Sequence, residues 1–333
     1  MKIALIIIAI LIGITAVLTF AFGYVMYRYA IVRTKKEKRQ VNYWEDGGEN
    51  KGFFLEMREE VGKRASECAA KIKADVTDTV YITSRDGLNL CGHIVEGEGD
   101  KGVAILMHGY RSGVLVDFSL SADYFRSRGF TLLLPDERAH GESEGGHICF
   151  GALERFDVVD WAKYAEERWP DKPVLVCGVS MGASAVMMGA GVGYPKNVKA
   201  IMADCGFTSG GEIGKKCLKQ WFHLPPFPVY YGAKLWTKWL AHFDLDEVSS
   251  RKSLENLRGT GIKVLIVHGK ADDFVPYEMS LENVKAFDYM PESARREAME
   301  FLSVEGAGHA QSFVVDEKTY VEALDRLLAK AGM

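Results

Sequence analysis

The sequence predicts an α/β protein built on a mostly parallel sheet, with helices on both faces of the sheet and an apolar helix at the N-terminus. Two observations predict the sheet. Strand-length apolar runs alternate with helical segments, and the runs are near-continuously apolar, as strands buried on both faces are. The third observation is an uncharged stretch from Ile3 to Tyr27. At 333 residues, the chain is long enough for one large domain and an appendage.

Residues 1–39 are expected to form a membrane anchor with a basic flank. About twenty apolar residues span a bilayer as a helix, and the stretch from Ile3 to Tyr27 is longer than the apolar core of a cleaved signal peptide. Interfacial tyrosines and basic residues mark its end, namely Tyr24, Tyr27, Tyr29, Arg28, Arg33, Lys35, Lys36, Lys38 and Arg39. We therefore expect an uncleaved, single-pass helix in the cell membrane rather than a signal peptide.

The distribution of charge indicates which partners the chain has. The basic residues that follow the apolar stretch place the globular domain in the cytoplasm, whereas the short leader with Lys2 favours the opposite orientation. Because the whole chain carries −4 and residues 1–39 carry +6, residues 40–333 carry −10. An acidic globule without a basic stripe excludes nucleic acid as a partner, while the basic flank suits anionic lipid headgroups.

The rest of the chain divides into a linker with an amphipathic helix, residues 40–74, and a main domain, residues 75–333. The amphipathic helix is predicted over Phe53–Ile72. The predicted strands are Thr79–Thr83, Leu88–Val95, Gly102–Met107, Phe130–Leu134, 174–180, Val198–Asp204, Ile262–Val267 and Ala298–Ser303. The predicted helices of the domain are Asp117–Arg128, Ala152–Arg168, a helix after Ser180, and Thr319–Ala331.

An insertion at about residues 207–261 interrupts the alternation of strands and helices. It is rich in aromatic residues and prolines, and it is expected to form a small, mostly helical cap over the strand ends. The composition fits two alternatives equally well. The cap either lines a substrate site or packs as a peripheral pair of helices with its own small core.

The stretch Val174–Gly182 organises the domain. An apolar, β-branched run ends there in Gly-x-Ser-x-Gly, and small residues follow. This pattern predicts a buried strand, a tight turn with Ser180 at its strained apex, and a closely packed helix. Gly178 and Gly182 are expected because a Cβ at either position would clash with nearby backbone. The Ser180 hydroxyl would then lie at a helix N-terminus, where it can act as a nucleophile.

A serine nucleophile needs a general base, and the base needs a carboxylate that orients it. His309, in Gly-Ala-Gly-His-Ala after the last predicted strand, would accept the Ser180 proton. Asp272, in the turn after another strand, would accept the Nδ1 proton of His309. Asp273 is the alternative to Asp272 for this role.

Other polar groups at the strand ends complete the expected site. The backbone N–H groups of Tyr110 and Met181 would form an oxyanion hole. Three residues are expected to hold loops in place rather than to react, namely His108, Asp204 and His268. The six cysteines lack a metal-binding spacing such as C-x-x-C and are expected to be reduced structural thiols, so no metal site is expected; they are Cys68, Cys91, Cys149, Cys177, Cys205 and Cys217.

Together these residues resemble the α/β-hydrolase family, in its bacterial serine-aminopeptidase-like and Bem46-like branch. The resemblance covers about residues 75–332 and rests on four motifs and on the order Ser, Asp, His; the motifs are 108–110, 178–182, Asp272 in His-Gly-x-x-Asp-x-x-Val-Pro, and His309 in Gly-x-Gly-His. It implies an eight-stranded sheet, an acyl-enzyme mechanism and no cofactor. The loop 136–143 resembles a structural loop of the family, with Ala139 in place of a glycine.

The expected function is therefore that of a membrane-anchored serine hydrolase that cleaves carboxylic esters of small-molecule or lipid-like acyl compounds. A peptidase, a thioesterase or an acyltransferase would use the same three side chains, and these alternatives stay open because the discriminating contacts lie in the cap. A non-catalytic, membrane-tethered binding protein is a further alternative. The presence of all three reactive residue types argues against it.

Overall fold

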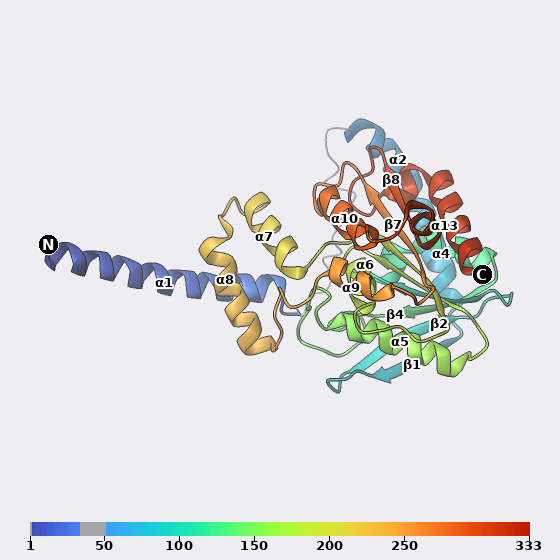
Figure 1. Ribbon diagram of the computed structural model, residues 1–333, viewed down its shortest axis with the longest axis horizontal. Coiled ribbons are helices and arrows are strands. Elements are labelled where there is room, and N and C mark those ends of the chain that lie inside the picture. The colour runs from blue at the N-terminus through green and yellow to red at the C-terminus, as the bar shows by residue number, and fades with distance from the viewer. Residues whose placement is uncertain (1, 34–50) are drawn as a thin grey trace.

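The computed structural model describes the backbone of residues 2–33 and 51–333 (Figure 1). Side chains are described for residues 2–33 and 60–333. The basic residues Lys35, Lys36, Lys38 and Arg39 and most of the expected linker lie outside the described residues.

An eight-stranded sheet forms the centre of the molecule, with the strand order β1-β2-β4-β3-β5-β6-β7-β8. In this sheet β2 runs antiparallel to β1 and β4, and the remaining neighbours are parallel. Every residue of β3, β4 and β5 is buried, which explains their continuous apolar sequences. The predicted strand number and mostly parallel order are confirmed. The strands are β1 (Asp78–Thr83), β2 (Asn89–Val95), β3 (Gly102–Met107), β4 (Phe130–Pro135), β5 (Val174–Val179), β6 (Val198–Asp204), β7 (Lys263–Gly269) and β8 (Met299–Val304).

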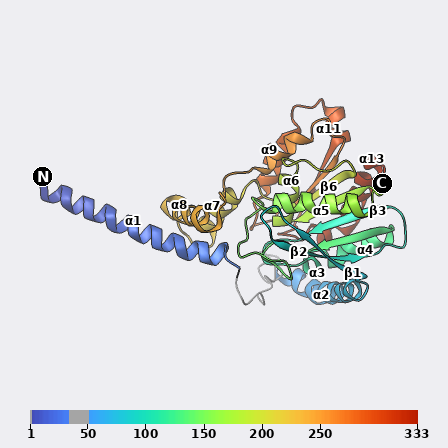
Figure 2. The same ribbon diagram turned by 90° about the horizontal axis from the view of Figure 1, so that it is seen from below.

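Helices cover both faces of the sheet, as the sequence predicts, and one apolar core lies on each face (Figure 2). One core contains Trp161 of α5 (Glu154–Arg168), Val186 of α6 (Met181–Gly189) and Leu254 of α9 (Ser250–Leu254). The other contains Phe125 of α4 (Ser119–Ser127) and Leu324 of α13 (Glu317–Ala331). Further short helices connect these elements, namely α3 (Val114–Asp117), η2 (Glu255–Leu257), α10 (Tyr277–Val284), η3 (Lys285–Phe287), α11 (Glu292–Ala298) and α12 (Ser312–Val315).

One predicted helix is found in full, and another starts at a different residue. The predicted helix Phe53–Ile72 is found as α2 (Lys51–Ala74), and its buried Ile72 joins the core beside α4. The predicted helix Asp117–Arg128 is wrong at its start, because α3 ends at Asp117 and α4 begins at Ser119. The Asp117 carboxylate binds the loop after β3 instead of starting a helix.

The cap consists of α7 (Gly210–Gln220), α8 (Pro226–Trp236) and the π-helical turn η1 (Thr237–Ala241). These elements extend from the body toward the N-terminal helix (Figure 1). The predicted range 207–261 is too long at its C-terminal end, because Leu254 and Leu257 are buried in the core against the sheet. The α7 side chains Ile213 and Cys217 pack in an apolar cluster with residues that follow the strand ends, so α7 covers that edge of the sheet.

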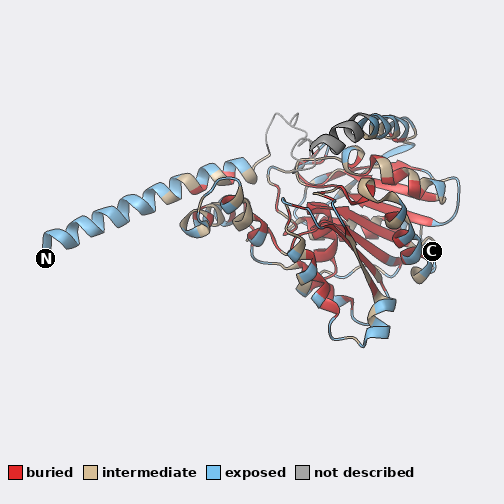
Figure 3. Cartoon of the chain, turned by 90° about the horizontal axis from the view of Figure 1, so that it is seen from above, coloured by how far each residue is buried: buried red, intermediate tan, exposed pale blue. Residues whose placement is uncertain are grey.

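The N-terminal helix α1 (Lys2–Ala30) has two parts. The side chains of its first part are exposed, and its C-terminal turns pack on the cap and the body (Figure 3). The prediction of an interfacial tyrosine belt is wrong for Tyr27, which is 3% exposed and shares a hydrogen bond of 2.8 Å with the His147 ring. The reason is that α1 continues into a bridge between Val32 and His147, so its end is part of the folded body.

Candidate active site

Ser180 lies at the apex of a sharp turn between β5 and α6. Its backbone angles are φ 55° and ψ −113°, a strained conformation for a residue with a Cβ. The glycines of the motif allow the close approach that the turn requires. A Cβ on Gly178 would lie 2.4 Å from the carbonyl carbon of Gly182, and a Cβ on Gly182 would lie 2.2 Å from the Met107 oxygen. The turn is thus packed against both its own helix and the end of β3.

The structure brings together the three side chains that the sequence singles out. The Nε2 atom of His309 lies 2.9 Å from the Ser180 hydroxyl oxygen, and its Nδ1 lies 2.8 Å from Oδ2 of Asp272. All three residues are buried, with exposed fractions of 3% for Ser180, 6% for His309 and 8% for Asp272. They follow β5, β8 and β7, whose carboxyl ends share one edge of the sheet.

Asp272 is held by hydrogen bonds at both carboxylate oxygens. Its Oδ1 accepts the backbone N–H groups of Phe274 and Val275, and its Oδ2 lies 3.2 Å from Nε2 of His268. Burial alone would raise the pKa of Asp272, but the charge of His309 and the hydrogen bonds hold it well below its usual range. The alternative acid, Asp273, is exposed, whereas Asp272 is buried and accepts the hydrogen bond from His309.

His309 is set up to act as a base. With its Nδ1–H donated to Asp272, its Nε2 can accept the Ser180 proton. Burial alone would lower the pKa of His309, but the carboxylate of Asp272 outweighs burial and raises that pKa above its ordinary value. The ring also lies against Phe274, with centroids 4.7 Å apart.

The loop after β3 lies against Ser180. A Cβ on Gly109 would be 3.3 Å from the Ser180 Cβ, so the next residue, Tyr110, is close to the nucleophile. His108 holds this loop, because its Nδ1 donates to the Gly109 carbonyl and its Nε2 accepts the N–H of Glu137. The expected structural role of His108 is consistent with these bonds, whereas His268 also contacts the acid of the site.

Two residues that the sequence analysis did not single out hold the same loop. Asp117 accepts the Gly109 N–H and the Ser112 hydroxyl, each at 2.6 Å, and burial raises its pKa. His140 accepts the Arg111 N–H at 2.9 Å, and burial lowers its pKa to about 3, which keeps the ring neutral. No sequence pattern marks Asp117. His140 belongs to the loop 136–143, whose resemblance to a family motif was the available signal.

The end of α1 contacts this loop directly. The Tyr110 hydroxyl donates to the Ala30 carbonyl at 2.9 Å, and the Arg111 guanidinium donates to the Tyr29 carbonyl at 2.5 Å. The Tyr110 ring also stacks on Phe150, with centroids 5.1 Å apart. The candidate oxyanion residue is therefore linked to the N-terminal helix.

Apolar side chains and the cap enclose the nucleophile. Met181 and Phe207 form a buried cluster with Ile213 of α7, and Tyr110 and Phe274 pack against it. On the other side of the site, a small cavity of about 60 Å³ adjoins His309, and its lining includes Asp117, Ser119, Leu120 and Phe313. Asp204 ends β6, accepts the Ser312 hydroxyl and receives the Ser180 N–H at its backbone oxygen, which fits a loop-holding role.

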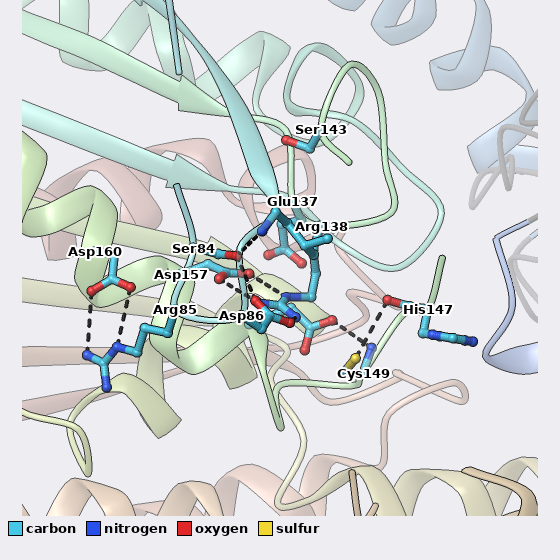
Figure 4. Close-up of polar contacts among 12 residues, drawn as sticks. Ser84, Arg85, Asp86, Glu137, Arg138, Ser143, His147, Cys149, Asp157 and Asp160 are labelled. Carbon is cyan, nitrogen blue, oxygen red and sulfur yellow. Dashed lines mark hydrogen bonds and ion pairs between the residues drawn. The ribbon is translucent and has the colours of Figure 1, made fainter. Parts of the chain in front are cut away.

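The loop 136–143 is anchored by a buried cluster of charges (Figure 4). The guanidinium of Arg138 binds Asp157 at 2.6 Å and Asp86 at 2.8 Å. Burial raises the pKa of Asp157 to about 7, although Arg138 opposes this rise. Burial and the charges of Glu154 and Asp157 raise the pKa of Glu137 well above its ordinary value. These groups hold the loop and do not touch Ser180.

Among the described residues, two groups have ligand atoms within 4.8 Å of one another, as a metal site requires. One consists of Cys205, Asp272 and His309, two of which belong to the candidate triad. The other consists of Cys91, His93 and Asp136 at the edge of β2. Cys91 and His93 are two residues apart on a strand and so share a face, a signal that a search for C-x-x-C misses.

Comparisons with known proteins agree with this geometry. The sequence model of the serine aminopeptidase S33 family matches residues 99–225. The uncharacterized protein YqkD of Bacillus subtilis is 24% identical over 248 residues, which cover 74% of this chain and 77% of that protein. The uncharacterized protein Rv2307c of Mycobacterium tuberculosis is 26% identical over 259 residues, which cover 76% and 80%.

Solved structures show the same fold. The esterase Pf2001 of Pyrococcus furiosus aligns with a TM-score of 0.60 at 21% identity, covering 76% of this chain and 90% of that chain. The strand order of the sheet, the position of the candidate site at the strand ends and the family match are all consistent with this fold. This chain has the α/β-hydrolase fold, and its residues 99–225 are similar to the serine aminopeptidase S33 family.

Proposed function

We propose that this chain is a membrane-anchored serine hydrolase that cleaves carboxylic esters through an acyl-enzyme intermediate. The observation that carries the proposal is the continuous hydrogen-bonded line from the Ser180 hydroxyl through His309 to Asp272. In such a line the base takes the serine proton as the hydroxyl attacks, and the carboxylate stabilises the imidazolium that forms.

The reaction would proceed in two halves. In the first half, Ser180 attacks the acyl carbon, the N–H groups of Tyr110 and Met181 stabilise the oxyanion, and His309 protonates the leaving alcohol. In the second half, His309 takes a proton from water, the resulting hydroxide attacks the acyl carbon, and Ser180 leaves with the proton returned. The carboxylic acid is then released, and the site needs no cofactor for either half.

An ester substrate is favoured by the apolar lining of the site. Phe274, which is partly buried and lies against the His309 ring, offers an aromatic surface to an acyl chain, with the buried cluster of Met181 and Phe207 behind it. The name of the matching family suggests an aminopeptidase as the second candidate. This candidate would use the same Ser180, His309 and Asp272, and the two activities differ only in the substrate that is cleaved.

A retained anchor is supported by the packing of α1. The helix is apolar enough to cross a membrane, with a mean hydropathy of 3.0 over its most apolar window. A cleaved signal peptide would leave with the groups that Tyr110 and Arg111 bind, the Ala30 and Tyr29 carbonyls. The basic residues after the span place the catalytic domain in the cytoplasm in this proposal.

A fluorophosphonate probe tests the nucleophile. We expect the probe to label the full chain, and we expect the Ser180→Ala variant to remain unlabelled while Ser66→Ala, at an exposed serine of α2, labels normally. Labelling of Ser180→Ala would contradict the proposal. A panel of p-nitrophenyl esters and aminoacyl amides then separates the two candidate activities, and turnover of the amides alone would identify a peptidase.

A further inference from the structure

The cap carries an apolar surface that no other described part of the chain covers. Four large side chains form it, with exposed fractions of 73% for Phe227, 51% for Tyr231, 57% for Leu235 and 66% for Trp239. Tyr231, Leu235 and Trp239 follow one another at four-residue spacing along α8 and η1. Phe227 has a non-helical backbone, and its ring lies beside that of Tyr231, with centroids 5.8 Å apart. We call these four residues the cap stripe.

The other sides of α8 have partners. On the side that faces the rest of the cap, the Tyr230 hydroxyl and the Lys234 ammonium both bind Asp246, at 2.7 Å and 2.6 Å. Toward α1, a Cβ on Gly232 would lie 2.7 Å from the Thr19 carbonyl oxygen, so the two helix backbones touch. The cap stripe is thus the one side of a well-packed helix for which the described chain supplies no cover.

The position of the cap stripe relative to α1 identifies its partner. A span of about 20 residues that begins at Ile3 ends near Phe22. The α8 helix meets α1 at this end, since Trp236 donates its indole N–H to the Phe20 carbonyl at 2.8 Å. Figures 1 and 2 show α8 crossing α1 steeply, so α8 lies along the membrane plane when α1 crosses the bilayer.

We infer that the cap stripe lies in the interfacial layer of the lipid bilayer, beside the membrane span. Phe, Tyr, Trp and Leu on one side of a helix are the composition of interfacial helices, and Tyr and Trp concentrate at the headgroup level. The lysines of the same segment point to other partners, because Lys234 and Lys238 both pair with Asp244. An apolar face without a competing charge favours insertion.

This position defines the substrate class of the proposed hydrolase, and here the inference rests on the proposed function. Aromatic side chains lead from the cap to the base. The ring centroids of Trp221, at the end of α7, and Phe274 lie 4.5 Å apart, and those of Phe274 and His309 lie 4.7 Å apart. The geometry suits long-chain acyl esters that reside in the bilayer and reach Ser180 beneath the cap, rather than esters that diffuse through water.

Tryptophan quenching tests the docking without relying on turnover. The full chain is placed in nanodiscs that contain phosphatidylcholine brominated on its acyl chains. We expect the brominated lipid to quench a clearly smaller share of the tryptophan fluorescence in the Trp239→Phe variant than in the wild type. In the matched variant Trp169→Phe, on the body after α5, the quenched share should not fall. Equal quenching changes in the two variants would overturn the docking.

Hydrolysis tests the substrate class with two esters of one chromophore. The substrates are p-nitrophenyl palmitate in the nanodisc and p-nitrophenyl butyrate in water. We expect Leu235→Glu to lower the palmitate rate about tenfold, because a carboxylate replaces an apolar contact with the bilayer, and to leave the butyrate rate unchanged. Leu281→Glu, at an exposed leucine of α10, should change neither rate.

The outcomes separate the two proposals. Equal loss on both esters in Leu235→Glu, or no loss on either, would refute the substrate class. If the wild-type chain cleaves neither ester and resists the fluorophosphonate probe, the proposed function fails, while the quenching result still decides whether the cap stripe lies in the bilayer.

Discussion

The Tyr110 hydroxyl donates a hydrogen bond to the Ala30 carbonyl across 2.9 Å. This contact links the loop that lies against Ser180 to the last turn of α1, 80 residues earlier in the chain. The N-terminal helix is thus a structural support of the candidate site as well as a candidate anchor.

Replacing Tyr110 by Phe removes this bond and keeps the ring. One hydrogen bond contributes about 1 kcal/mol, so we expect kcat/KM on a water-soluble ester to fall about two- to tenfold as the loop becomes less ordered. The matched variant Tyr124→Phe loses a bond of similar length, to Asp325, on the outer side of the domain. It should lower the melting temperature and leave kcat/KM unchanged. Equal kinetic effects would show that the link to α1 has no role in the site.

The pH dependence of kcat/KM reports on His309. The reaction needs this ring neutral, and the Asp272 carboxylate raises its pKa, so kcat/KM should rise with pH to a midpoint above the ordinary histidine value of about 6.5. Asp272→Asn removes that charge. We expect the midpoint to move to lower pH and kcat to fall by a factor of about 10⁴. Asp273→Asn is the control, since its exposed side chain lies outside the hydrogen-bonded series of Ser180, His309 and Asp272. Its pH profile of kcat/KM should match that of the wild type.

The contact between α1 and α8 depends on Gly23. A Cβ at this position would lie 2.4 Å from the carbonyl carbon of Gly232, whereas a Cβ on Gly13 meets nothing within 4 Å. Gly23→Ala should therefore separate the helices and destabilise the full chain in detergent by about 1–3 kcal/mol. Gly13→Ala should not. Thermal unfolding and limited proteolysis of the cap measure both variants, and identical melting curves would contradict the packing.

The charge cluster beneath the loop 136–143 offers a stability test. Arg138 binds the buried Asp157 and the half-exposed Asp86. Asp157→Ala leaves a buried guanidinium with its exposed partner only, so we expect a loss of about 3–5 kcal/mol in the free energy of unfolding. Asp86→Ala should cost about 1 kcal/mol or less. Urea unfolding measures both losses of unfolding free energy. A larger loss for Asp86→Ala than for Asp157→Ala would contradict the assignment of Asp157 as the main partner of Arg138.

Much of the fold and of the candidate site could be predicted from the sequence because local patterns carry the signal. The apolar runs of β3, β5 and β6 mark strands buried on both faces. The two glycines around Ser180 mark a turn that a Cβ would prevent. The triad candidates follow strands, and parallel strands place their carboxyl ends at one edge of the sheet, so Ser180, Asp272 and His309 could be paired before their distances were known.

The start of α4 and the roles of Asp117 and His140 could not be predicted in this way. Asp117 lies where a helix start is plausible, yet its carboxylate binds a loop residue eight positions earlier. Such a bond depends on where the chain folds back, and no periodicity records it. The end of the cap was also misplaced, because Leu254 and Leu257 reach the core only through the packing of α9 on α6.

The amino-acid sequence alone determined the sheet, the sharp turn at Ser180 and the apolar character of α1, since each depends on residues close together in the chain. Only the tertiary structure decided that the end of α1 packs on the cap and supports the loop at Tyr110. The physical reason is that Gly23 and Gly232, and likewise Tyr110 and Ala30, are far apart in sequence. Whether such residues meet depends on the free energy of the whole packed chain, which short patterns do not encode.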